Sequence, residues 1–200
     1  MTELTTNAEQ AITLLKPLCG EHKKVAKPFG CVRNEVRYIG ATDGKLLVLI
    51  RSEIELPELP LSLGSVFAHY KQGKPVNFAA LKAFAGKAQE VAPCPKCNGH
   101  GGRTHCCEDC SQWEGAREVY QQLRPGKVGP LWFNLNLLAR AFEVIPAVKV
   151  IELSIAEHYG RTIDETPPLF AVAPDWWVIL MPISPGSESN DIPTFNVSEF

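Results

Sequence analysis

The chain has 200 residues, with 22 acidic and 20 basic side chains, a formal net charge of −2 and 45% hydrophobic residues. These totals are those of an ordinary globular protein with one sizeable core, and the net charge does not by itself indicate nucleic-acid binding. No run of about 18 apolar residues occurs, which excludes a membrane-spanning helix. The start of the chain lacks the basic residues and apolar run of a secretory signal, so we expect a cytoplasmic protein.

Charge is distributed unevenly along the chain. Residues 1–51 carry eight Lys and Arg against five Asp and Glu, whereas residues 152–200 carry one arginine against eight acidic residues. The basic first segment suits a surface that faces phosphates, and a solvated surface with chance asymmetry explains it equally well. The candidate phosphate contacts in this segment are Lys16, Lys23, Lys24 and Lys27. Their alternative role is to complement the C-terminus of the preceding helix.

The first half of the chain predicts a helix followed by a meander of strands. Thr6 and Glu9 form a capping box ahead of apolar residues at helical spacing, which predicts a helix from Asn7 to Lys16. Asp43-Gly44 lies between two apolar runs, which predicts a hairpin turn. Predicted strands cover 29–32, 36–41 and 45–51, an edge or connection covers 53–60, and helices cover 62–71 and 77–89, the last capped by Asn77.

The second half repeats this order. Pro125-Gly126 breaks the chain, and 131–133 leads into a helix that is capped by Asn134 and stops before Pro146. Predicted strands follow at 148–155, 169–173 and 176–183, with a turn at Pro174-Asp175. From residue 184 the composition is typical of a mobile tail. The repeated order predicts an α+β fold made by internal duplication of one helix-plus-strand-meander unit.

Between the two halves lies a cysteine pattern typical of a metal site. The pairs Cys94–Cys97 and Cys107–Cys110 each have two residues between their members, a spacing that lets four thiolates bind one Zn²⁺. Such a closed site stabilises structure and leaves no position for a catalytic water. Cys106, His100 and His105 lie close enough to replace a ligand, and the alternative to zinc is a pair of turns with reduced thiols.

The stretch Cys94-Pro95-Lys96-Cys97-Asn98-Gly99-His100-Gly101 resembles the CxxCxGxG repeat of the cysteine-rich domain of DnaJ-type chaperones. The resemblance covers about twenty residues, and the second cysteine pair lacks the glycines of that repeat. It therefore implies a zinc knuckle, and we carry over no chaperone activity from it.

Four further segments resemble the bacterial DNA polymerase III β sliding clamp. They are Val36 to Leu46 with its ATDG hairpin, the helix start Phe133 to Leu138, the strand Val150 to Ser154, and the last hairpin Asp175 to Ile183. The resemblance implies a processivity fold, in which two helices lie side by side beneath outer sheets and face DNA phosphates. Arg140 is the DNA-facing residue that it suggests on the second helix. Ser184 stands where the family has an arginine in its peptide pocket.

Together these patterns predict a division into residues 1–90 and 116–184 as the halves of one clamp-like domain, 91–115 as an inserted zinc module, and 185–200 as a mobile tail. The expected function is non-enzymatic: a clamp-like protein of DNA replication or repair, phage-borne or bacterial, that binds duplex DNA or replication proteins and forms a homo-oligomer. The alternative is an adaptor or inhibitor of replication proteins that never encircles DNA. This alternative is suggested by residues 190–195 of the chain, which resemble the acidic tip of bacterial single-stranded-DNA-binding proteins.

Overall fold

The computed structural model describes residues 8–21, 25–59, 63–86, 125–155, 166–183 and 193–197, and the fold below is that of these ranges. They form a mixed α+β structure, as the sequence predicts. Its helices are α1 (Ala8–Leu15), the short 3-10 helix η1 (Lys16–Leu18), α2 (Gly64–Ala68), α3 (Phe78–Gly86) and α6 (Leu135–Val144). No helix within the described ranges has the length and apolar character needed to span a bilayer.

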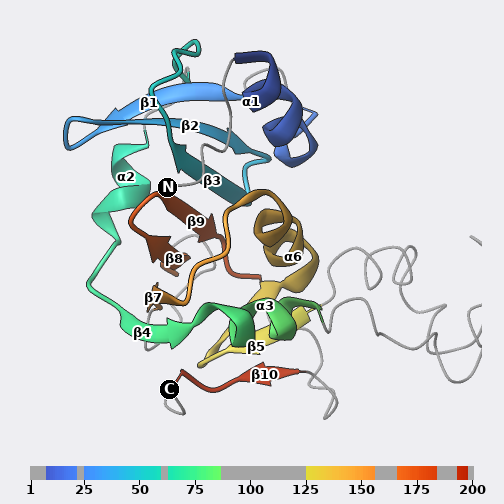
Figure 1. Ribbon diagram of the computed structural model, residues 1–200. Coiled ribbons are helices and arrows are strands. Elements are labelled where there is room, and N and C mark those ends of the chain that lie inside the picture. The colour runs from blue at the N-terminus through green and yellow to red at the C-terminus, as the bar shows by residue number, and fades with distance from the viewer. Residues whose placement is uncertain are drawn as a thin grey trace, which may run out of the picture.

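Seven antiparallel strands make the main sheet (Figure 1). In spatial order they are β1 (Phe29–Arg33), β2 (Val36–Thr42), β3 (Leu46–Arg51), β9 (Trp176–Leu180), β8 (Leu169–Ala173), β7 (Val150–Ser154) and β4 (Lys74–Asn77). Strands β1 to β3 form one meander and β7 to β9 another, and the two join where β3 pairs with β9. A meander uses short local connections, which explains why the alternating pattern of each half is readable in the sequence.

An approximate two-fold axis relates the two central hairpins. Val48 of β3 lies opposite Val178 of β9. Within each meander the same register recurs, because Ala41 pairs with Val48 and Ala171 pairs with Val178. The two hairpins therefore place equivalent residues at equivalent positions on either side of the β3–β9 junction. This is the arrangement expected of a duplicated unit.

Alternation along the strands gives the main sheet two apolar faces. On the inner face, Val48, Trp176 and Val178 belong to the larger core cluster, which α1, α3 and α6 cover. On the outer face, Leu49 and Ile179 belong to a second cluster, which α2 and the residues after it cover. Figure 1 shows α1, α6 and α3 on one side of the sheet and α2 on the other. Among the described residues, a single short helix covers the outer face.

The helices α3 and α6 start in the same way and pack side by side. Each follows a strand directly and is capped by an asparagine, since Ala80 N donates to Asn77 Oδ1 (3.1 Å) and Asn136 N donates to Asn134 Oδ1 (3.0 Å). These two caps confirm the predicted helix starts. One helix comes from each predicted half of the chain, and the rings of Phe78 and Phe142 meet between them with centroids 5.2 Å apart.

Asp43 has the turn role that the sequence predicts. Its Oδ1 accepts hydrogen bonds from Lys45 N and Leu46 N, both at 2.8 Å, and Gly44 adopts a positive φ of 91°. The carboxylate is thus used to close the β2–β3 hairpin.

Three short segments differ from the sequence predictions. The helix expected over 62–71 is reduced to α2, and the expected breaker at Pro125-Gly126 is the start of a strand. Residues 131–133, expected to lead into a helix, are extended as well. These stretches form β5 (Pro125–Val128) and β6 (Leu131–Asn134), which pair antiparallel in a small second sheet. Pro125 is the first residue of its strand, a position where the missing N–H is tolerated.

The third strand of the small sheet comes from the expected tail. β10 (Thr194–Phe195) pairs parallel with β5, and Phe195 is buried with its ring centroid 5.4 Å from that of Phe84 on α3. Residues 193–197 therefore differ from the mobile tail expected over 185–200. The polar composition of the whole segment misled the prediction, because a single aromatic anchor fixes these five residues.

Candidate functional site

The outer face of the main sheet carries a cluster of rings around one arginine. Arg33 ends β1, and its guanidinium carbon lies 3.8 Å from the ring centroid of Trp177 and 4.1 Å from that of Phe67. Tyr70 completes the cluster, since its ring meets that of Trp177 edge-on at 4.9 Å. Phe67 lies on α2 and Tyr70 follows it, so these two residues clamp the arginine against the sheet.

The arginine of this cluster is only partly satisfied. Nη1 of Arg33 is buried and has no hydrogen-bond partner among the described residues. Burial in this apolar setting lowers the pKa of the Arg33 guanidinium. An unpaired buried donor costs free energy, which the ring contacts offset. A buried donor that is kept despite this free-energy cost indicates a candidate functional site on the outer face.

A carboxylate is fixed next to this cluster. Glu152 points outward from β7, and its Oε1 accepts hydrogen bonds from the Tyr70 hydroxyl and from Gly73 N, the latter at 2.7 Å. Desolvation and the bond to Glu152 raise the pKa of Tyr70 to about 12, so the phenol stays protonated and acts as the donor. A Cβ at Gly73 would lie 2.3 Å from the Leu153 carbonyl oxygen, so only glycine lets the backbone come this close.

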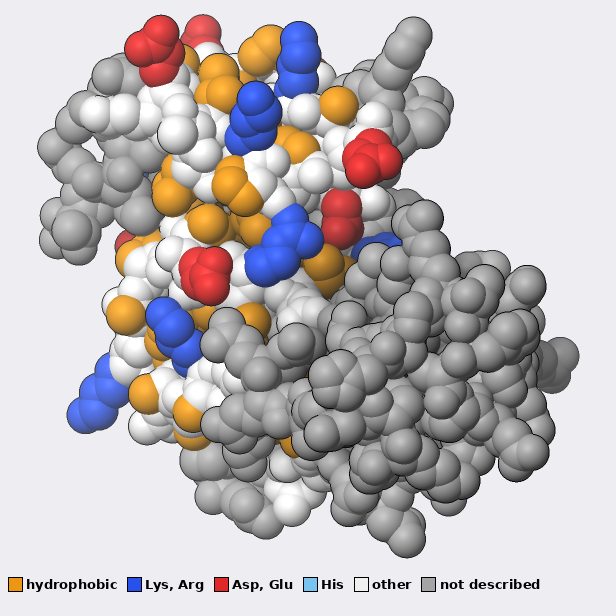
Figure 2. All heavy atoms as spheres, turned by 90° about the vertical axis from the view of Figure 1, so that its right-hand side faces the viewer, with side chains coloured by type: hydrophobic (Ala, Val, Ile, Leu, Met, Phe, Trp, Pro, Cys, Tyr) orange, Lys and Arg blue, Asp and Glu red, His pale blue; other side chains and the backbone are white. Residues whose placement is uncertain are grey.

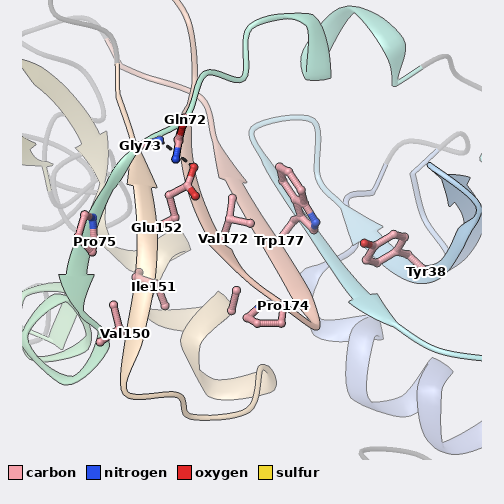
Figure 3. Close-up of a pocket in the computed structure, with 11 residues that line it drawn as sticks. Tyr38, Gln72, Gly73, Pro75, Val150, Ile151, Glu152, Val172, Pro174 and Trp177 are labelled. Atoms are coloured by element: carbon pink, nitrogen blue, oxygen red, sulfur yellow. Dashed lines mark hydrogen bonds between the residues drawn. The ribbon is translucent and has the colours of Figure 1, made fainter.

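An open groove of about 600 Å³ lies beside the carboxylate (Figure 3). Figure 3 shows Glu152 toward one end of the groove, Val172 in the middle, and the rings of Trp177 and Tyr38 toward the other. Its lining residues are Tyr38, Gln72, Gly73, Pro75, Val150, Ile151, Glu152, Val172, Ala173, Pro174 and Trp177. None of these described lining residues is His, Cys, Ser or Thr, and the groove presents one carboxylate among apolar and aromatic side chains.

Of the predicted phosphate contacts, Lys16 and Arg140 lie on the helical side of the molecule, in η1 and α6. Lys16, in η1, and Lys27 are both exposed, while Lys23 and Lys24 fall outside the described residues. Arg140 on α6 donates from Nη2 to the Pro17 carbonyl. The structure thus brings Arg140 next to η1, and part of its donor capacity is used to tie the two helices together.

Figure 2 shows the side of the molecule that carries α1, α3 and α6. Lys and Arg side chains are spread over its coloured part among apolar and acidic ones, without a single basic patch. A surface of this kind can contact phosphates at separate points.

The predicted zinc ligands Cys94, Cys97, Cys107 and Cys110 lie outside the described residues, as does the whole predicted module 91–115. Within the described ranges no group of three or more His, Cys, Asp or Glu side chains is placed to hold a metal ion. The zinc site therefore stays a prediction from cysteine spacing.

Sequence reasoning missed Arg33, Phe67, Tyr70 and Glu152 as members of a site. Glu152 had a readable signal, since it occupies an outward position of the predicted strand 148–155, whereas Arg33 lies just beyond the predicted strand 29–32 and is the last residue of β1 in the structure. No sequence signal indicated that the residues of this site would lie close together. Glu152 is 82 residues from Tyr70 and 79 from Gly73, and only the pairing of β4 with β7 brings the three together. Alternation along β9 separates the two tryptophans, since Trp176 is fully buried on the inner face and Trp177 packs against Arg33 on the outer face.

Comparison of the chain with protein-family models, with curated proteins and with solved structures found no match. The function is therefore argued from the fold and the surfaces described above.

Proposed function

We propose that this chain is a non-enzymatic, clamp-like binding protein of DNA replication or repair, with a structural zinc knuckle inserted between the halves of its domain. The observation that carries the proposal is the symmetric junction of two like meanders at β3–β9, with Val48 opposite Val178. The packing of α3 against α6, one helix from each half, also supports it. Both features accord with the processivity fold that the sequence resembles.

The chain supplies one such domain, and a ring needs several. A clamp-like role therefore requires either several copies of this chain or docking onto another ring. In either assembly the helical side would face DNA, and Lys16 of η1 is expected to contact phosphates there, with Lys27 of the connection to β1 as the second exposed lysine expected to do so. Arg140 donates a hydrogen bond to the Pro17 carbonyl, so it fixes the position of η1 and also adds a positive charge to this side.

Salt-dependent binding of a fluorescent DNA duplex tests the proposal. Neutralising phosphates releases counterions, so affinity should fall steeply with salt, and each lysine that contacts a phosphate contributes about 0.9 to the slope. The double variant Lys16→Gln, Lys27→Gln should reduce that slope by roughly two units. A matched variant, Arg51→Gln with Lys71→Gln, removes two exposed basic side chains from the outer side of the sheet and should leave the slope unchanged. Absence of binding at low salt would contradict the DNA-binding part of the proposal.

The zinc knuckle is tested separately by the mass of the intact protein under native conditions. One bound Zn²⁺ is expected for the wild-type chain and none for Cys94→Ser with Cys97→Ser. The same measurement reports the number of copies in the assembly. A ring-sized assembly supports encirclement of DNA, and a monomer favours the adaptor.

The second candidate function, an adaptor of replication proteins, is favoured by the open groove on the outer face. The version of the adaptor that uses the chain terminus has less support, because Phe195 is buried within the small sheet of the same molecule.

A further inference from the structure

The formal charge on the described lining of the outer-face groove is negative only. Among its described lining residues Glu152 is the only one that carries a charge at neutral pH. The remaining walls are mostly apolar side chains together with the rings of Tyr38 and Trp177. Aromatic faces carry negative electrostatic potential, so the rings and the carboxylate favour the same kind of guest. That guest is a cation with an apolar stem.

The carboxylate is held in advance of any binding. Both hydrogen bonds that Glu152 makes within the described residues end on Oε1, one from Tyr70 and one from Gly73. Oε2 keeps its acceptor capacity, so a guest can bond to it without displacing the bonds that orient the side chain. A pre-oriented acceptor loses little conformational entropy on binding.

The positive charges nearby leave Glu152 available. Arg33 lies against Trp177, and it is not one of the groove-lining residues. Arg51 and Asp175 lie near the Trp177 end of the groove, in positions next to Tyr38 and Pro174, with Nη1 and Oδ1 3.9 Å apart. Their charges offset each other. Lys71 and Lys74 are exposed on either side of Gln72 and Gly73 and do not line the groove, and no described basic residue forms an ion pair with Glu152, which is therefore the charge inside the groove.

The shape of the groove indicates a side chain of a larger partner. It is open to solvent, and Val150 on its lining is 51% exposed, a high fraction for a large apolar side chain. An enclosed pocket would suit a small molecule, which must bury most of its own surface. An open groove with an exposed apolar rim suits a peptide that covers the rim with a second side chain.

We propose that this groove is a docking site for an extended peptide of a partner protein, which directs an arginine or lysine to Glu152 and packs an apolar neighbour on Val150. The proposal does not depend on DNA binding, and it assigns a partner chemistry to the adaptor function above. Arginine is the better guest, because its planar guanidinium both stacks on rings and donates to a carboxylate.

Titration of the ¹⁵N-labelled full-length chain with the capped dipeptide acetyl-leucyl-arginine amide tests the proposal. The neutral isostere, acetyl-leucyl-citrulline amide, is the matched probe. The arginyl probe should produce saturable shifts at the indole N–H of Trp177 and the amide of Gly73, with a Kd roughly ten-fold below that of the citrulline probe. The indole signal is assigned by its loss in Trp177→Phe.

Two variants separate binding at the groove from general attraction to a charged surface. Glu152→Gln retains an oxygen that can accept from Tyr70 and Gly73, and it should abolish the preference for arginine. Glu143→Gln removes an exposed carboxylate from α6 on the other side of the sheet and should leave the preference intact. Equal affinity for the two probes, an unchanged preference in Glu152→Gln, or no saturable shift at millimolar probe would each overturn the proposal. None of these outcomes bears on the duplex titration.

Discussion

The inner and outer faces of the main sheet are closed in different ways. On the inner face three helices cover an apolar cluster in which Phe78, Phe142 and Trp176 meet ring to ring, and the Trp176 indole donates to the Pro146 carbonyl. On the outer face one short helix covers a smaller cluster that includes a cation, Arg33, and lies against a fixed carboxylate, Glu152. Packing on the inner face stabilises the fold. This stabilisation compensates for the free-energy cost of holding polar groups in an apolar setting on the outer face.

The largest expected effect comes from removing a ring on the inner face. Phe142 is 1% exposed, and Phe142→Ala leaves a cavity between α3 and α6 that should lower the free energy of unfolding by about 3–5 kcal/mol. The outer-face counterpart Phe67→Ala removes a half-buried ring and should cost roughly 1–2 kcal/mol. Urea unfolding measures both. Equal losses would refute the division between a stabilising face and a binding face.

A close backbone contact on the outer face gives the next effect. Gly73→Ala places a Cβ against the Leu153 carbonyl and pushes β4 away from β7, which should cost about 1–3 kcal/mol. Gly86→Ala is the matched control, because a Cβ there meets nothing within 4 Å and alanine favours the helix. The control should be neutral or slightly stabilising. Loss of the Trp177 indole shift on probe binding would accompany the first variant alone.

A smaller effect is expected when the cation of the outer cluster is replaced by an apolar side chain of similar length. Arg33→Met removes the unpaired buried Nη1 and keeps the contact with Phe67 and Trp177, so the free energy of unfolding should change by less than about 1 kcal/mol. Arg33→Ala, which also removes the stem, should be the more destabilising of the two. A large loss in Arg33→Met would show that the charge itself stabilises the cluster.

These two faces also separate what local sequence signals predict from what they do not. The alternation of β1 to β3 and β7 to β9 predicts six strands of the main sheet, and the asparagine caps predict the starts of α3 and α6. Such signals depend on neighbours in the chain. β4, β5 and β10 have four residues or fewer, and tertiary pairing decides their conformation, so no local pattern marks them.

The candidate site shows the same limit. Tyr70, Gly73 and Glu152 each have an ordinary local role, and their hydrogen bonds exist because β4 pairs with β7 after a connection of more than seventy residues. The sequence predicts that Glu152 points away from the core, since Ile151 and Leu153 on either side are buried. It does not predict what Glu152 meets there. The cysteine pattern, by contrast, is wholly local, and it was the most readable chemistry of the chain.

The smallest expected effect is the alkaline titration of Tyr70. The pKa of Tyr70 is raised to about 12 in the folded protein, above its ordinary value of about 10, chiefly by desolvation and then by Glu152. The unfolded chain therefore loses this proton first, and the stabilising contribution is complete below pH 10 and is lost as the pH rises from about 10 to 12. Tyr70→Phe should remove the tyrosine transition near pH 12 at 295 nm and weaken the fall in stability over this interval. In Glu152→Gln the transition should move to lower pH, because the carboxylate charge no longer opposes ionisation. A Tyr70 transition that stays in place in Glu152→Gln would mean that burial alone sets the pKa, and that the carboxylate faces the groove without support from the ring cluster.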